Sequence, residues 1–152
     1  MLNNEIKNIY ETVLALDYFK ILTQIIQKAG QTEKLSKEGP FTLFGPHDGA
    51  FYTFTTYDPN DIAHEIAVIT LEEILASKKA AEEILNYLLV PERYTLSDLR
   101  TFTSITAVNN QNIPIEITNG NIIPGNSDLM NTDIECSNGI IHVTGSVLRP
   151  TL

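Results

Sequence analysis

The stretch TDIECSNGIIHVTGSVLRP, residues 132–150, decides the fold and holds the chain's only cysteine and one of its three histidines. Cys136 and His142 flank an Asn-Gly pair, and Asp133 lies just upstream. These residue types suit two interpretations: a metal or nucleophile site, or a strand–turn–strand that uses them structurally. Most conclusions about function depend on which interpretation holds.

Neither a metal centre nor a nucleophilic centre fits the spacing. Zinc ligands usually come in pairs about two to four residues apart, whereas Cys136 and His142 are six apart and no second Cys/His pair exists. No basic residue beside Cys136 would lower the pKa of its thiol, and Ser146 lacks the glycines of a nucleophile elbow. We therefore expect no catalytic residue, no metal and no cofactor, and interpret Cys136 as a small buried residue.

The alternation along the second half of this stretch explains its histidine. Ile141 and Val143 point to one face of a strand, and His142 points to the other. A buried imidazole must be hydrogen-bonded, because an unsatisfied buried polar group is costly. We therefore predict a structural, hydrogen-bonded His142, and a tight turn with positive φ at Asn138-Gly139.

Upstream of this stretch, the first hundred residues are mainly helical. Apolar residues recur at helical spacing in three segments, residues 6–14, 18–29 and 81–88. Residues 41–44 interrupt them as a short strand bracketed by two Gly-Pro pairs. The expected caps and stops are Asp17, Gly30, Asp48, Thr70, Ser77, Pro91 and Thr95.

After Arg100 the sequence becomes β-rich. Residues 101–108 contain no helix-favouring run, and isoleucines alternate with other residues from 113 to 117. Asn119-Gly120 predicts a type I′ hairpin turn, and residues 139–143 and 146–148 are expected as strands. Helices first and strands later predict an α+β fold rather than alternating β-α-β units.

Length and charge restrict the possible functions. The 152 residues fit one domain, 1–152. Ten Lys/Arg against 19 Asp/Glu give a net charge of −9, with no basic run, so binding to nucleic acid or to an anionic membrane surface is disfavoured. No apolar run approaches the roughly 18 residues that span a bilayer, and we expect no membrane insertion. The opening MLNNEIKN lacks the features of a secretory signal.

Three segments together resemble the fasciclin domain family. GPFTLFGPHDGAF, residues 39–51, is similar to the first signature block, and residues 132–150 are similar to the second, in which Asp-Ile precedes Asn-Gly-Val-Ile-His-Val. Between them, ILNYLLVP, residues 84–91, resembles the family's central Leu-x-Tyr-His-Val-Val-Pro segment. The resemblance covers nearly the whole chain. It implies a fasciclin-like α+β fold, with helices packed beside a β-sandwich-like wedge, and no catalysis.

The resemblance also implies partner-binding residues. In periostin-like matrix members, two patches are linked to integrin binding. The first corresponds here to Asn131-Thr132-Asp133-Ile134-Glu135, with Glu where Leu is usual, and the second is a Tyr-His pair, of which Tyr87 remains. The expected partner-binding residues are therefore Asn131, Asp133, Ile134 and Tyr87. A structural alternative stays open, in which Asp133 and Ile134 supply turn chemistry and a core side chain.

By this resemblance we expect a non-enzymatic cell-adhesion or surface-interaction domain. Its partner would be a protein or glycan, met extracellularly or at a cell surface, and weak contacts would gain strength by repetition or oligomerisation. The alternative is a carrier of a small apolar ligand such as a pigment. A third hypothesis is an enzyme that uses Cys136.

Overall fold

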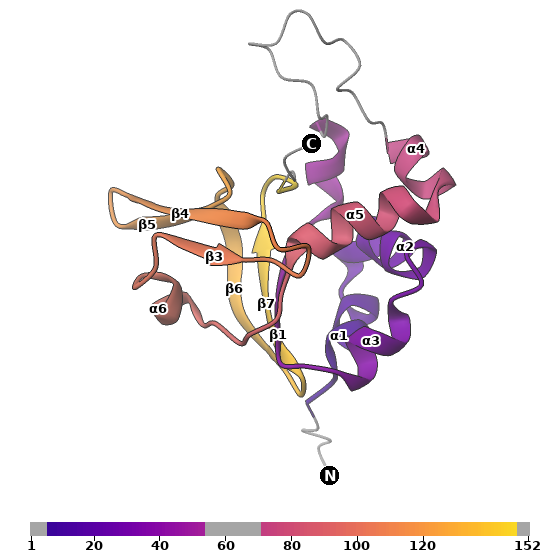
Figure 1. Ribbon diagram of the computed structural model, residues 1–152, viewed down its shortest axis with the longest axis horizontal. Helices are drawn as coiled ribbons and strands as arrows, with labels where there is room; N and C mark the ends of the chain where they lie inside the picture. The colour runs from indigo at the N-terminus through magenta and orange to yellow at the C-terminus, as the bar shows by residue number, and fades with distance from the viewer. Residues whose placement is uncertain (1–5, 54–70, 149–152) are drawn as a thin grey trace, which may run out of the picture.

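The computed structural model describes residues 6–53 and 71–148 and shows a helical layer, a central sheet and a projecting second sheet (Figure 1). The helical elements are α1 (Ile9–Ala15), η1 (Asp17–Phe19), α2 (Lys20–Lys28), α3 (Thr32–Lys37), η2 (Asp48–Thr53), α4 (Leu71–Ala76), α5 (Lys78–Leu88) and α6 (Leu96–Leu99). The strands are β1 (Phe41–Pro46), β2 (Leu89–Val90), β3 (Ser104–Thr106), β4 (Asn112–Thr118), β5 (Asn121–Pro124), β6 (Leu129–Cys136) and β7 (Gly139–Thr144). The α+β prediction is confirmed.

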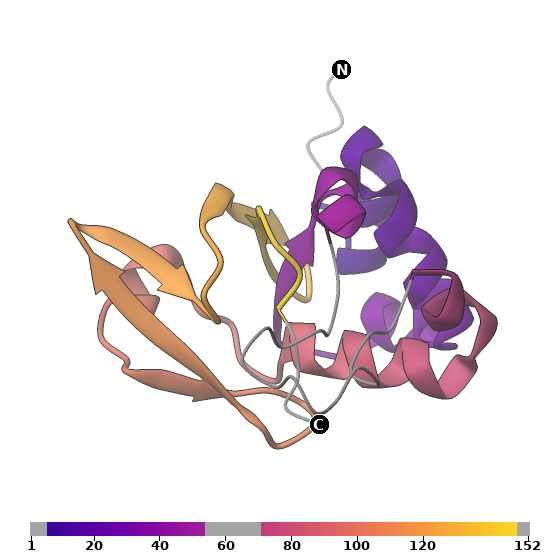
Figure 2. The same ribbon diagram turned by 90° about the horizontal axis from the view of Figure 1, so that it is seen from above.

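The central sheet joins the two ends of the chain. Its strand order is β2-β1-β7-β6, and β1 runs parallel to β7 with Phe41 opposite Gly139 and Phe44 opposite His142. Every residue of β1 and β7 is buried, because this sheet lies between the helical layer and the second sheet (Figure 2). Strands covered on both faces have near-continuous apolar sequences, as the segments around 41–44 and 140–143 do.

The second sheet, which we call the wing, has the order β3-β4-β5 and projects away from the helices (Figure 2). Its buried face carries Ile105, Ile113, Ile115 and Ile122. Asn119 and Gly120 connect β4 to β5 with φ values of 54° and 81°, the left-handed conformation that a type I′ turn requires at both positions. The predicted alternating strand and its hairpin turn are confirmed.

The helix caps confirm two predictions and overturn a third. Ser77 caps α5 by accepting a hydrogen bond from the main-chain nitrogen of Ala80 (3.2 Å), and Thr95 forms a capping box at α6. Asp17 does not cap the second helix but begins the 3₁₀ turn η1. The carboxylate of Asp48 accepts from the main-chain nitrogen of Ile21 instead (2.8 Å), so this helix end receives its cap from a residue distant in sequence.

Two turn and strand predictions near the C-terminus are wrong. Residues 146–148 form no strand, because hydrogen bonds to side chains hold this segment instead. The hydroxyl of Thr144 donates to the main-chain oxygen of Ser146 (2.7 Å), and the N–H of Ser146 donates to the hydroxyl of Ser127 (3.0 Å). Asn138-Gly139 has no positive φ. Gly139 is required there because a Cβ would collide with the main-chain oxygen of Phe41.

The structure changes one prediction of burial, and two further predictions fall on residues that it does not describe. Ile6 and Leu14, expected on the buried face of the first helix, are 56% and 52% exposed. The expected loop at residues 57–61 and the expected cap at Thr70 fall outside the described residues.

Candidate partner-binding surface

Three of the four expected binding residues lie on β6, the edge strand of the central sheet. The pairing of β6 with β7 is irregular: Asn131 lies opposite Val143, while Ile134 lies opposite Ile141. Three steps along β6 therefore match two steps along β7, which defines a β-bulge at Thr132 and Asp133. Asp133 adopts φ 59° in this bulge, a conformation that Asp tolerates better than most residues.

The bulge turns Asp133 toward α6. Its side-chain Oδ1 accepts a hydrogen bond from the main-chain nitrogen of Leu96 (2.9 Å), at the first turn of that helix. Its own N–H donates to Nδ1 of His142 (3.2 Å). Asp133 thus connects β6, β7 and α6, even though the residue itself is exposed to solvent.

His142 is buried at the centre of this network. Its Nε2 lies 2.8 Å from the carbonyl oxygen of Tyr94, while Nδ1 accepts from Asp133. This pairing requires the neutral tautomer with the proton on Nε2. Burial lowers the pKa of His142, and the Tyr94 carbonyl and the Asp133 charge oppose that shift. The prediction of a hydrogen-bonded structural histidine is confirmed.

A second buried residue, Thr42 on β1, holds the segment between β2 and α6. Its hydroxyl donates to the carbonyl oxygen of Glu92 (2.6 Å) and accepts from the N–H of Tyr94 (2.7 Å). Sequence reasoning missed Thr42. The only signal was a polar residue within the otherwise apolar run of residues 41–44.

The outer surface of β6 is mixed in character. Met130 is 59% exposed and Asn131 is also exposed, whereas Ile134 is half-buried and packs against the core. Glu135 forms an exposed ion pair with Arg93 (3.1 Å). Met130, Asn131 and Asp133 thus present an apolar, an amide and an acidic group on one edge strand, a suitable composition for contact with another macromolecule.

Tyr87 lies apart from this surface. It belongs to α5, is 5% exposed, and donates its hydroxyl to the carbonyl oxygen of Asn112 (3.0 Å). Burial raises the pKa of this phenol. The structure therefore groups Asn131, Asp133 and Ile134 and places Tyr87 in the core.

Cys136 and His47 serve structural contacts. Cys136 is buried, with its sulfur 3.5 Å from the hydroxyl of Thr12, and burial raises the pKa of the thiol. A raised pKa disfavours the nucleophilic thiolate. Nδ1 of His47 accepts from the N–H of Gly49 (3.1 Å). Across residues 6–53 and 71–148, no group of three or more His, Cys, Asp or Glu side chains is placed to hold a metal ion.

Two open grooves border the wing. The first, about 550 Å³, runs between α3 and the β3–β4 loop, and its lining mixes the lysines Lys34 and Lys37 with Phe41 and Pro91. The second, about 340 Å³, lies between β5, β6 and α6, and we call it the wing groove. Thr132 of the bulge lines it, so the wing groove adjoins the expected binding residues.

The fasciclin domain model matches residues 17–150 of this chain. The chain belongs to the fasciclin domain family. Fasciclin domains are often adhesion-related interaction modules, and members of the family are often extracellular or surface proteins. Among the described residues, no helix has the length and apolar character to cross a membrane.

Relatives of this fasciclin domain come from bacteria and animals. The chain is 26% identical over 144 residues to protein sll1483 of Synechocystis sp., covering 95% of the chain and 74% of that protein. It is 28% identical over 141 residues to the uncharacterized Synechocystis protein sll1735, covering 93% and 96%. It is 25% identical over 132 residues to the transforming growth factor-beta-induced protein ig-h3 of Sus scrofa, covering 87% of the chain and 18% of that protein.

A solved structure shows the same fold. A FAS1 domain pair from the insect cell adhesion molecule Fasciclin I superposes with a TM-score of 0.74 at 19% identity. The match covers 95% of this fasciclin domain and 51% of that chain. The chain thus spans about half of the domain pair, which confirms the fasciclin-like arrangement of helices beside a β-wedge.

Proposed function

We propose that this fasciclin domain is a non-enzymatic adhesion module that meets a protein or glycan partner at a cell surface or in the extracellular space. The observation that carries the proposal is the bulged edge strand β6, which holds Met130, Asn131 and Asp133 at the surface of the sheet. Family membership and the likeness to an insect cell adhesion molecule support it.

The proposed contact surface consists of Met130, Asn131, Asp133 and the exposed part of Ile134. Asp133 has a double role, because the carboxylate that would face a partner also caps α6. Tyr87 is omitted from the contact, since its ring and hydroxyl are used inside the fold. Interaction energy is concentrated in few residues of such surfaces, with large side chains at the centre, so Met130 is the expected anchor.

The test compares two matched truncations of exposed apolar side chains. Wells are coated with wild type, Met130→Ala, Asn131→Ala or Leu14→Ala, and the attachment of cells, matrix proteins and glycans is measured. Met130 and Leu14 are 59% and 52% exposed, but Leu14 belongs to α1. We expect Met130→Ala and Asn131→Ala to reduce attachment and Leu14→Ala to leave it unchanged.

Asp133→Asn adds a variant that retains an acceptor oxygen for α6 but removes the negative charge. Equal attachment of wild type, Met130→Ala, Asn131→Ala and Asp133→Asn would contradict the proposed surface. Circular dichroism of each variant before coating excludes a loss of folding as the cause of reduced attachment.

A further inference from the structure

The wing groove separates two strand edges that belong to different sheets. β5 is the last strand of the wing and β6 is the last strand of the central sheet. The two are joined by residues 125–128, and residues 121–123 of β5 and Leu129 and Thr132 of β6 line the groove. An exposed edge carries main-chain donors and acceptors that can pair with another strand.

The main-chain groups of Ile122 are the candidates for such pairs on β5, and the residue as a whole is 5% exposed. Thr118 and Asn121 flank the two-residue hairpin turn, and Ile117 lies opposite Ile122. Hydrogen-bonded and non-hydrogen-bonded pairs alternate along an antiparallel ladder, and the pair that flanks such a turn is hydrogen-bonded. The N–H and C=O of Ile122 therefore point away from β4, and within residues 6–53 and 71–148 neither has a hydrogen-bond partner.

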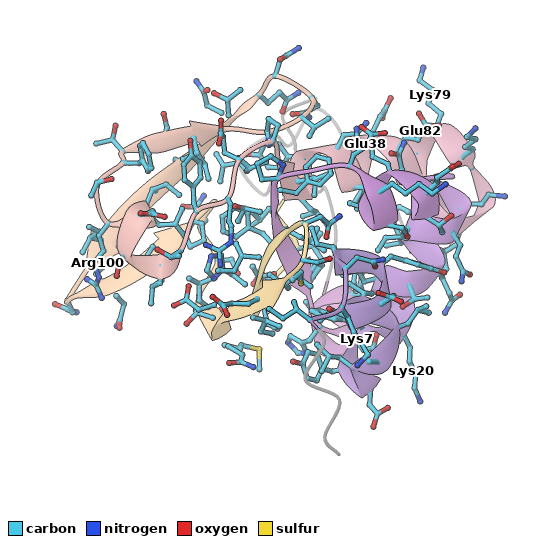
Figure 3. The ribbon with its side chains drawn as sticks, turned by 90° about the horizontal axis from the view of Figure 1, so that it is seen from below. Lys7, Lys20, Glu38, Lys79, Glu82 and Arg100 are labelled. Carbon is cyan, nitrogen blue, oxygen red and sulfur yellow. The ribbon has the colours of Figure 1, made fainter. Side chains whose placement is uncertain are left out.

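The lining of the groove mixes apolar and polar residues and carries one cation, Arg100, and one acid, Asp128. Leu96 and Leu129 supply aliphatic walls, and Arg100 lies at the end of α6. Figure 3 shows Arg100 beside the wing, far from the other labelled charged side chains, which lie over the helical layer. The exposed guanidinium of Arg100 makes one hydrogen bond, to the carbonyl oxygen of Gly120 (3.3 Å).

Charge restricts which strand this groove accepts. Residues 101–148 contain no lysine or arginine. Among the described residues that line the groove, Arg100 is the only cation and Asp128 the only acid, and the Asp128 carboxylate lies against Gly145. The edge also lacks the lysines with which many proteins prevent strand addition. A planar guanidinium with unused N–H groups favours a carboxylate, which it can bind through two parallel hydrogen bonds.

We propose that the wing groove binds an extended peptide of a partner protein, which adds as a strand to the free edge of β5 and places an acidic side chain on Arg100. The main chain of the peptide pairs with Ile122, and apolar side chains at alternate positions pack against Leu96 and Leu129. In strand addition of this kind, main-chain hydrogen bonds provide the affinity and side-chain pockets provide the specificity. The inference does not require Met130, Asn131 or Asp133 to contact the partner.

The test uses three synthetic peptides and the amide spectrum of the ¹⁵N-labelled protein. The first probe is acetyl-Val-Thr-Val-Thr-Asp-amide, in which both valines and the Asp lie on one face of an extended strand. The second replaces its Asp by Asn, and the third replaces its first Thr by Pro, which removes a donor and prevents strand pairing. We expect the first probe to shift the amides of Ile122, Ile123 and Thr132, with a Kd of about 1 mM or tighter.

The Asn probe should bind about two- to fivefold more weakly, the range for an exposed ion pair, and the Pro probe should not shift these amides. Arg100→Gln should remove the preference for Asp over Asn while retaining binding of both. Arg100→Lys should retain part of the preference, because Lys keeps the charge but not the planar fork. Thr132→Lys, which places a long charged side chain in the groove, should block the Asp and Asn probes.

Several outcomes would overturn the proposal. These are an absence of shifts at millimolar peptide, equal binding of the Pro probe, or shifts confined to residues outside the groove. Amide shifts at Ile122 that depend on protein concentration and resist peptide competition would show that a second copy of the chain occupies the edge instead. Attachment that depends on Met130 without any peptide binding would overturn this inference alone and leave the proposed adhesion surface standing.

Discussion

The turn that follows β6 and the bulge in the middle of β6, which we call the turn end and the bulge end, are each fixed by one polar side chain, but they connect different parts of the molecule. At the turn into β7, the amide of Asn138 accepts from the N–H of Ile9 (2.9 Å) and donates to the carbonyl oxygens of Leu35 (2.8 Å) and Glu38 (2.7 Å). At the bulge, Asp133 binds the start of α6. The turn end therefore holds the helical layer, and the bulge end holds the segment that borders the wing.

The side chains of Asn138 and Asp133 differ in how many of their hydrogen-bonding groups remain free for a partner. Asn138 is half-buried and uses its oxygen and both N–H donors within the fold, so only one lone pair of the oxygen remains for a partner. Asp133 is exposed, and one of its carboxylate oxygens accepts from the N–H of Leu96. A carboxylate can accept about four hydrogen bonds, so Asp133 can serve the fold and a partner together.

The largest expected effect comes from breaking the turn end. Asn138→Ala removes three hydrogen bonds of about 1 kcal/mol each, so the free energy of unfolding should fall by about 3 kcal/mol. Urea denaturation followed by circular dichroism measures this loss. The control is Ser137→Ala at the exposed neighbouring position, which should stay within about 0.5 kcal/mol of wild type. Equal stability of both variants would show that Asn138 does not hold the helical layer.

The next largest effect concerns the segment that leads into α6. Thr42→Val keeps the shape of the side chain but leaves the N–H of Tyr94 and the carbonyl of Glu92 without their partner. We expect a loss of about 2 kcal/mol in unfolding free energy, since an unsatisfied buried group costs about 1–3 kcal/mol. Thr42→Ser retains the hydroxyl and should recover most of this loss. Hydrogen exchange at the Tyr94 amide should accelerate only in the valine variant.

These contacts show which parts of the fold the sequence could predict. Helix α5 and the β4–β5 hairpin follow from local patterns: a cap at Ser77, apolar spacing, and Asn119-Gly120 at a turn. Each depends on residues within one element. Local rules therefore suffice where the hydrogen-bonding partners are close in sequence.

The missed contacts join residues that are distant in sequence. Asp48 caps a helix 27 residues upstream, and Thr42 binds a segment about 50 residues downstream. For His142, the alternation predicted burial and hydrogen bonding but gave no indication of Tyr94 or Asp133 as partners. The family resemblance located Asn131, Asp133 and Ile134 in sequence, but the bulge that exposes them depends on the register between β6 and β7.

Acidification tests the centre of the network between the two ends. The pKa of His142 is lowered from 6.5 by burial, so the unfolded chain takes up the proton more readily than the folded chain. The contribution of neutral His142 to stability is therefore complete above pH 6.5 and is lost as the pH falls through the lowered pKa. Protonation also places an N–H on Nδ1 against the N–H of Asp133.

The measurement is the free energy of unfolding in urea at a series of pH values below 6.5. Wild type should lose stability with a slope steeper than that of His142→Gln by up to about 1.4 kcal/mol per pH unit, the limit for one proton. Parallel curves for wild type and His142→Gln would contradict a structural role for the neutral imidazole.

The smallest expected effect comes from the bulge end itself. Asp133→Gly permits the positive φ but removes the hydrogen bond to the N–H of Leu96 at the start of α6, so the unfolding free energy should fall by about 1 kcal/mol. Asp133→Asn keeps an acceptor oxygen and also tolerates positive φ, and should remain close to wild type. Faster hydrogen exchange at the Leu96 amide in the glycine variant alone would locate the change at α6.

A double variant tests whether the turn end and the bulge end act independently. If they do, the losses of unfolding free energy in Asn138→Ala and Asp133→Gly add within about 0.5 kcal/mol. A larger discrepancy would mean that the helical layer and the α6 segment are coupled through the strand between them.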